Sequence, residues 1–291
     1  MSWGIWFNLA EKLGLSIEEK FLFNTRMNAF TILFAAVLAG LLIWAFFKPK
    51  KSGLEVPDAF PKKWSAFLLE KVRFYQELDE PEKREFEARI QGFLNRIRIT
   101  GIKTDVSEED RLLVASSAVI PIFRFPEWEY NTLVEVLLYP DHFTEEFNFS
   151  EGDRNIAGMA GSGGMMSNLV IFSKPALWQG FDNQSDKQNV GIHEFIHLFD
   201  KQDGVVDGVP AIFMKHQFVL PWIDLIKKNT AKMLEGNSDI NVYGATNPQE
   251  FLAVTGEYFF ERPKLFKEKH PELYAILSTA FNTDLAGERE G

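Results

Sequence analysis

The stretch Asn189–Gly204 has the sequence NVGIHEFIHLFDKQDG, and it holds two of the chain's five histidines, four residues apart. On a helical wheel its apolar side chains occupy one face, and His193 and His197 lie on a neighbouring stripe. The Cβ atoms of the two histidines are then about 6 Å apart, so both imidazoles can reach one metal ion. The pattern predicts a metal site on a helix whose apolar face packs into the core.

The glutamate after the first histidine indicates what such a metal would do. Glu194 projects about 100° away from His193 around the helix, so it can reach a water molecule beside the ion without binding the ion itself. A metal that lowers the pKa of water, beside a carboxylate that takes the proton as general base, is typical of hydrolases. The alternative is a pair of ordinary helix histidines, and the helical HExxH context favours the metal site.

The bounds of this helix follow from local signals. Ser185 and Gln188 have the spacing of a capping box, which predicts that the helix begins there, and Gly204 predicts its end. Asp200 lies on the histidine stripe, but about 10.5 Å along the axis from His193, too far to bind the same ion. We expect Asp200 to orient a ligand histidine instead.

A third ligand is expected from the segment YGATNPQEFLAVTGEYFFERP, which starts at residue 243. Glu250 and Glu257 fall on one face of a predicted helix there. Asn247 and Pro248 match the preferences for the N-cap and the first helical position, so Glu250 has an alternative role as a capping residue. The residues alone leave both glutamates open. His216, in FMKHQF, is a further candidate that belongs to no motif.

Composition excludes several functions. The 291-residue chain is 46% hydrophobic, which is enough for the core of one large domain or two modest ones. Its formal net charge is -10, which argues against nucleic-acid binding because phosphate contacts need clustered Lys and Arg. The chain has no cysteine, so thiolate catalysis and disulfides are excluded, and a metal must be held by His, Asp or Glu.

An uncharged apolar run lies near the N-terminus, before the part of the chain that carries the histidine motif. Ala29–Phe47 would span roughly 28 Å as a helix, which predicts a single transmembrane helix at 29–47. The lysine-rich flank that follows favours a cell-membrane protein whose C-terminal domain faces the cytoplasm. Residues 1–28 are interpreted as an amphipathic extension, 48–61 as a linker, and 62–291 as the globular domain that carries the metal site.

The remaining patterns predict a mixed fold. Pro61–Arg98 reads as two helices with a break near Asp79–Pro81, and Ser107–Ile120 as a helix that opens with a capping box. Thr132–Tyr139 and Asn168–Ser173 are short β-rich runs bounded by turn residues. Together with the helices downstream, these elements predict an α+β domain.

Two further features lie outside these motifs. The cluster AGMAGSGGMM at 157–166 lacks the ending of a phosphate-binding loop, so we expect a mobile loop beside the substrate cleft. His142 and His270 stand among polar residues and are interpreted as surface histidines.

Several motifs in order resemble the Mlc titration factor A family of zinc-dependent peptidases: LVEVLLYP and a strand upstream, then HEFIHLFD, then NPQEFLAVTGEYFF. The resemblance covers roughly Lys62 to the C-terminus. It implies a zincin-like metallopeptidase domain of the gluzincin type. It also implies zinc as cofactor, with His193, His197 and Glu250 as ligands, and Tyr243 as a hydrogen-bond donor to the oxyanion.

The resemblance further implies that the strand in NLVIFS pairs with the substrate backbone. This sequence departs from the family's pattern at Asn247, where an aspartate is usual, and at Gly256, where a serine is usual. Neither position is a proposed ligand.

The resulting hypothesis is a zinc-dependent peptidase that acts on a peptide or protein substrate, with Glu194 as general base. The alternative is a regulatory protein that sequesters a transcriptional regulator, as the member that gives the family its name does, with the zinc site secondary. The intact HExxH favours hydrolysis, because a pure binder needs no general base. A structural zinc site is disfavoured, because such sites usually have four protein ligands.

Overall fold

The structure is a computed structural model of the whole chain. It describes residues 57, 59–144, 156–161, 168–183 and 185–287, together with Ile32, Phe34 and Leu38. The chain divides into two units, Met1–Gly53 and Leu54–Gly291. The motifs identified in the sequence all lie in the second unit.

The prediction of a single-pass membrane protein is corrected by the structure. In the described part of the chain, no helix has both the length and the apolar character needed to cross a bilayer. The predicted span at 29–47 lies outside the described residues except for Ile32, Phe34 and Leu38, which are helical. The predicted extension at 1–28 and most of the predicted linker at 48–61 also lie outside the described residues.

The second unit begins with three helices, α3 (Lys62–Lys71), α4 (Arg73–Gln76) and α5 (Glu80–Arg96). The predicted break near Asp79–Pro81 is confirmed, because the Asp79 side chain caps α5 by accepting a hydrogen bond from the Glu82 backbone N–H. The first predicted helix is itself divided at Val72, whose backbone is extended.

The central helix of the fold is α6 (Glu108–Ile122). Its predicted capping box is confirmed: the Ser107 side chain accepts from the Asp110 backbone N–H, and the Asp110 side chain accepts from the Ser107 backbone N–H. Every residue of α6 from Asp110 onward is buried. A helix that is buried all round must be covered by other elements on every side, and α5, α7 and α8 supply that cover.

The sheet has four strands in the order β1-β2-β4-β3. The strands β1 (Arg98–Gly101), β2 (Glu135–Tyr139) and β4 (Leu169–Ser173) are parallel, and β3 (Gly158–Ala160) runs antiparallel to β4. The two predicted strands are confirmed. The loop prediction is wrong for the start of the glycine cluster, which forms β3. Because β4 has a partner strand on each side, it has no free edge for the substrate pairing expected of NLVIFS.

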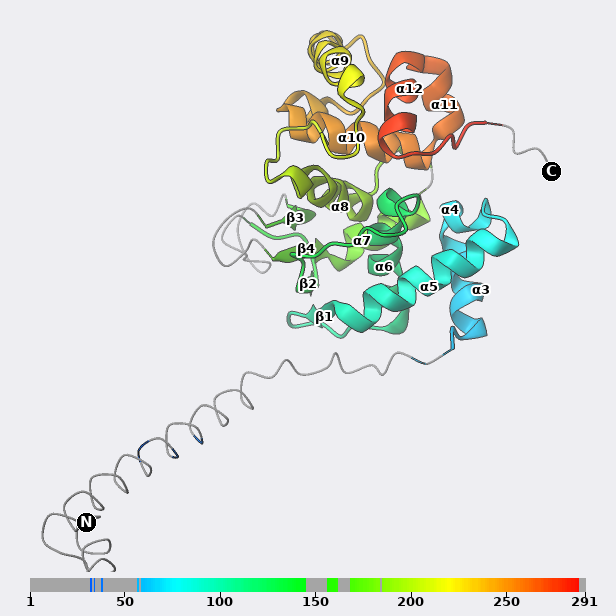
Figure 1. Cartoon of the computed structure of the whole chain (residues 1–291), viewed down its shortest axis with the longest axis vertical. Helices are drawn as coiled ribbons and strands as arrows, with labels where there is room; N and C mark the ends of the chain where they lie inside the picture. The colour runs from blue at the N-terminus through cyan, green and yellow to red at the C-terminus, as the bar shows by residue number, and fades with distance from the viewer. Residues whose placement is uncertain are drawn as a thin grey trace, which may run out of the picture. The chain divides into compact units, whose positions relative to one another are not determined.

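The remaining elements follow in sequence from the end of β4. They are α7 (Lys174–Asp182), α8 (Val190–Asp200), η2 (Lys201–Asp203), α9 (His216–Leu234), η3 (Val242–Ala245), α10 (Pro248–Glu261), α11 (Pro263–Lys269) and α12 (Pro271–Ala280). Figure 1 shows α8 between the sheet and the C-terminal helices, where it packs against α6, α10 and β3. The fold is mixed α+β, as predicted, and helix-rich with a small sheet.

The apolar face predicted for α8 anchors that helix in the core. Ile192, Phe195, Ile196 and Phe199 are each at most 1% exposed. The Phe195 ring contacts one aromatic ring from α5, one from β4 and one from the segment before β2. The Phe199 ring stacks on the Phe213 ring, with the two ring centroids 4.0 Å apart. Burial of each such side chain contributes about 1.5 to 3 kcal/mol, so α8 is held firmly in one orientation.

Candidate metal centre

The helix that carries the histidines begins at Val190, with Asn189 as its N-cap. The Asn189 side chain accepts a hydrogen bond from the Ile192 backbone N–H at 3.1 Å. The predicted start at Ser185 is wrong, because the backbone at Lys187 is left-handed, with a φ of 66°, and a right-handed helix cannot pass through it. The α-helix itself ends at Asp200, and the chain continues as the 3-10 turn η2 to Gly204, which closes it with a φ of 94°, so the glycine stop is confirmed.

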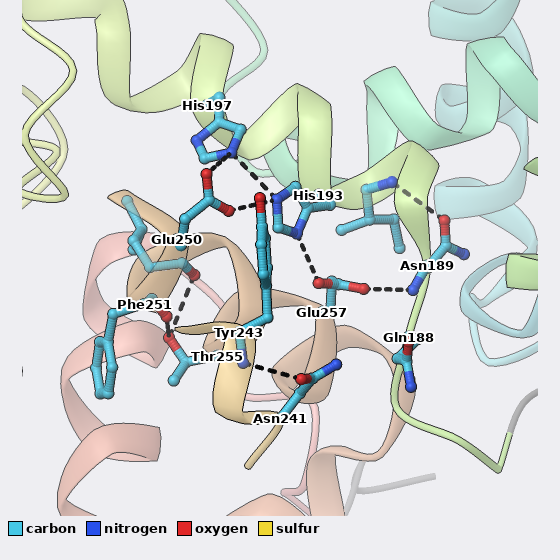
Figure 2. Close-up of polar contacts among 12 residues, drawn as sticks. Gln188, Asn189, His193, His197, Asn241, Tyr243, Glu250, Phe251, Thr255 and Glu257 are labelled. Carbon is cyan, nitrogen blue, oxygen red and sulfur yellow. Dashed lines mark hydrogen bonds and ion pairs between the residues drawn. The ribbon is translucent and has the colours of Figure 1, made fainter. Parts of the chain in front are cut away.

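His193, His197 and Glu250 converge on one point (Figure 2). The Nε2 atoms of the two histidines are 3.1 Å apart. The Glu250 carboxylate lies 2.9 Å from Nε2 of His193 through one oxygen and 3.5 Å from Nε2 of His197 through the other. Ligands placed tetrahedrally around zinc at its usual bond lengths are about 3.3 Å apart. The donor types and the spacing of this group therefore fit a zinc ion.

Glu250 reaches this point from the first turn of α10. Asn247 caps α10 by accepting from the Glu250 backbone N–H at 2.9 Å, and Pro248 occupies the first helical position, as predicted. The Glu250 carboxylate points at the histidines rather than back at the cap. Burial favours a higher pKa for Glu250, but hydrogen bonds from His193 and His197 outweigh it and lower the pKa to about 2. The group is thus an anion suited to a cation.

Glu257 lies on the other side of His193. One of its oxygens is 2.7 Å from Nδ1 of His193, and the other accepts a hydrogen bond from the Asn189 backbone N–H at 2.6 Å. Burial alone would lower the pKa of His193, but the negative charge of Glu257 and the hydrogen bond to Glu250 raise it well above its usual range. The same surroundings favour a metal cation at this position.

Asp200 does not occupy the place expected for it. Its carboxylate accepts a hydrogen bond from the Gly208 backbone N–H at 2.7 Å, which holds the loop after η2. The carboxylate found against Nδ1 of His193 is that of Glu257. His216 was considered as a third ligand, but it is the exposed first residue of α9 and does not belong to the cluster.

Glu194 is 6% exposed, and its carboxylate accepts a hydrogen bond from the Ala160 backbone N–H of β3 at 2.6 Å. Burial raises the pKa of Glu194, and the charges of the two histidines oppose that shift. β3 approaches so closely that a Cβ on Gly158 would lie 2.9 Å from a Glu194 carboxylate oxygen and 2.6 Å from Val190 Cγ2. Only glycine fits at residue 158 without displacing the carboxylate or the helix.

A cleft of about 500 Å³ opens in front of these groups. Its wall includes His193, Glu194 and Glu257, and Gly158 of β3. It also includes His142, whose side chain is 38% exposed, so this surface histidine borders the cleft. No local pattern marks His142, because the fold alone brings the end of β2 to the cleft.

Tyr243 projects into the same cleft from η3. Its ring centroid is 6.1 Å from that of His193, and Figure 2 shows its hydroxyl end directed toward the cluster. The Asn241 side chain fixes its backbone by accepting from the Tyr243 N–H at 3.0 Å. Burial, followed by the charge of Glu250, raises the pKa of Tyr243, so the phenol keeps its proton and can donate a hydrogen bond.

An HExxH helix, a carboxylate from a second helix and a cleft beside a short edge strand together define a metallopeptidase-like domain. The chain belongs to the family described as glucose-regulated metallo-peptidase M90, whose family model matches residues 48–282. The resemblance found in the sequence is thereby confirmed.

Individual relatives span most of the chain. An uncharacterized protein of Synechocystis is 29% identical over 228 residues, which cover 75% of this chain and 82% of that protein. The protein named Mlc titration factor A of Pectobacterium atrosepticum is 24% identical over 222 residues, or 71% of this chain and 81% of its own length. The protein of the same name from Escherichia fergusonii is 26% identical over 245 residues, or 76% and 85%.

Proposed function

We propose that this protein is a zinc-dependent peptidase, with His193, His197 and Glu250 as the zinc ligands and Glu194 as the general base. The observation that carries the proposal is the convergence of two imidazole nitrogens, 3.1 Å apart, with the Glu250 carboxylate, whose two oxygens lie 2.9 Å from one nitrogen and 3.5 Å from the other. A buried carboxylate next to them, held by Ala160, adds the one further group that hydrolysis requires. A site that only binds zinc for structure has no use for that group.

A bound zinc ion supplies Lewis acidity, which lowers the pKa of water and polarises a carbonyl group. Glu194 accepts the proton of the attacking water and passes it to the leaving amine. Burial of Glu194 supports this role, because a raised pKa makes a carboxylate a better base. Tyr243 donates a hydrogen bond to the oxyanion that develops on the substrate.

The strand that pairs with an extended substrate is β3 in this proposal, in place of β4. β3 is the terminal strand of the described sheet, and Gly158 lies in the cleft wall. A terminal strand offers backbone groups to a peptide, whereas a strand with two neighbours does not.

A second candidate function is the sequestration of a transcriptional regulator. The relatives named Mlc titration factor A favour it. In this alternative the regulator binds the protein surface, and the zinc site is secondary. The two candidates differ in whether removal of the general base abolishes function.

The test uses the purified protein, a broad peptide library and Glu194→Gln. We expect hydrolysis that a chelator abolishes and zinc restores, and a loss of at least about a hundredfold in Glu194→Gln with zinc content retained. Glu85→Gln, on the exposed face of α5, is the matched control and should keep full activity. Full activity in Glu194→Gln would refute the mechanism. If the whole library stays uncut while both wild type and Glu194→Gln bind a regulator, the second function replaces the first.

A further inference from the structure

Both polar groups of the Asn189 side chain, and its backbone N–H, form hydrogen bonds within the protein. The residue is 0% exposed. Its side-chain oxygen caps α8 at the Ile192 backbone N–H. Its side-chain NH₂ group donates to the Gly180 backbone oxygen at 3.0 Å and to a Glu261 carboxyl oxygen at 3.1 Å. Its backbone N–H donates to Glu257 at 2.6 Å. A helix cap needs only the first of these contacts, so the others call for a separate explanation.

These contacts join three helices at one buried point. Gly180 belongs to α7, Asn189 begins α8, and Glu257 and Glu261 lie one turn apart on α10. The approach of α7 is close enough that a Cβ on Gly180 would lie 2.9 Å from Asn189 Cγ. The side chain of Asn189 therefore has no room to take another orientation.

The contact to Glu257 leads directly to the metal cluster. Glu257 bridges Asn189 and Nδ1 of His193 with its two oxygens, and Nε2 of the same ring faces Glu250 and His197 (Figure 2). A carboxylate on the far nitrogen of a ligand histidine sets the tautomer and direction of the ring. Whatever fixes Glu257 therefore fixes the direction in which His193 presents its ligand atom.

We propose that Asn189 is a positioning residue for the metal site. Its side-chain NH₂ bonds to Gly180 and Glu261 fix the place of its backbone N–H, and this N–H holds Glu257, which aims His193. The inference rests on the proposed zinc site and goes beyond it, because Asn189 touches none of the three ligand side chains in the described contacts. Glu261 supports the arrangement. Burial raises the pKa of Glu261 to about 8, so near neutral pH its carboxyl group is largely protonated and adds little negative charge beside Glu257.

The test measures zinc affinity in Asn189→Ser by competition with a chromophoric chelator. Serine is a good N-cap, so the variant keeps the cap and loses both bonds of the NH₂ group. We expect zinc binding about 10 to 100-fold weaker than in wild type, and an altered absorption spectrum of the cobalt-substituted protein. Ser107→Ala is the matched control. It removes the cap of α6, away from the cluster, and should lower stability by about 0.5 to 2 kcal/mol with zinc affinity unchanged.

A double-mutant cycle with Glu257→Gln separates positioning from general loosening of the fold. If Asn189 acts through Glu257, Asn189→Ser should weaken zinc binding by less than about twofold in the Glu257→Gln background. Equal effects in both backgrounds would overturn the inference, and so would unchanged zinc affinity in Asn189→Ser. Should Asn189→Ser fail to fold, Asn189→Thr, which also caps a helix and lacks the NH₂ group, takes its place with the same expectations. A wild-type protein that binds no zinc refutes the proposed function, and the inference with it.

Discussion

Replacement of Glu261 with glutamine should change how the stability of the protein depends on pH. Glu261 is 7% exposed at the C-terminal end of α10. Burial raises the pKa of its carboxyl group from 4.5 to about 8, with further contributions from the charges of Glu257 and Asp186, against the opposing hydrogen bond from Asn189. In the unfolded chain, the same group titrates near its ordinary value.

The sign and the size of the effect follow from this difference. The folded protein binds the proton more tightly, so the contribution of Glu261 to the free energy of unfolding is fully present below a pH of about 4.5. It is lost as the pH rises through about 8. Well inside that window, each pH unit removes about 1.4 kcal/mol, so the loss between pH 5.5 and pH 7.5 is on the order of 2 to 3 kcal/mol. Glutamine does not ionise, so the free energy of unfolding of Glu261→Gln should not contain this decrease between about pH 4.5 and about pH 8.

The assay is urea unfolding of wild type and Glu261→Gln across this pH range, with the same zinc supplied to both. The stability of wild type relative to the variant should fall by about 2 to 3 kcal/mol from pH 5.5 to pH 7.5. Glu85→Gln, at an exposed position on α5, serves as the control and should follow the wild-type curve. Parallel curves for wild type and Glu261→Gln would show that the buried carboxyl group does not take up a proton on folding, and the reasoning would fail.

Two further predictions concern the cluster and β3. Glu250→Ala should purify largely without zinc, whereas Glu257→Ala should bind zinc about 10 to 100-fold more weakly but measurably, as metal analysis and chelator competition can determine. If Glu250→Ala binds stoichiometric zinc with unchanged affinity and Glu257→Ala does not, the ligand role belongs to Glu257. Gly158→Ala should lower peptidase activity by at least about tenfold with zinc retained, because the new Cβ would press on Val190 and the Glu194 carboxylate. Unchanged kinetics there would mean that β3 can shift at no cost.

The sequence predicted those parts of the site that depend on helical periodicity. The burial of Phe195 and Phe199 follows from the spacing of residues along α8, and the cap at Asn247 follows from the residues that begin α10. The structure has both as predicted. β3 could not be predicted, because three residues in a glycine-rich segment show no alternation of apolar and polar side chains. The start of α8 was misplaced because Ser185 and Gln188 match a capping box locally, while the turn before Asn189 prevents it.

The network behind the cluster could not be predicted for a different reason. Asn189 and Glu261 are 72 residues apart, and neither stands in a motif. A buried glutamate is unexpected from sequence, because an ionised carboxylate is costly to bury without a partner. The burial of Glu261 is explained only once α7, α8 and α10 are packed together, because the Asn189 side-chain amide then donates a hydrogen bond to its carboxyl group.

The division of the cluster between α8 and α10 also imposes an order of events during synthesis. His193 precedes Glu250 by 57 residues. A ribosome that adds about 5 to 20 residues per second needs roughly 3 to 11 s to pass from one to the other. During that interval the growing chain already carries both histidines and Glu194, but not the carboxylate that completes the group. The three side chains can meet only after α10 has emerged and docked on α8, so the proposed metal site is completed late in the synthesis of the protein.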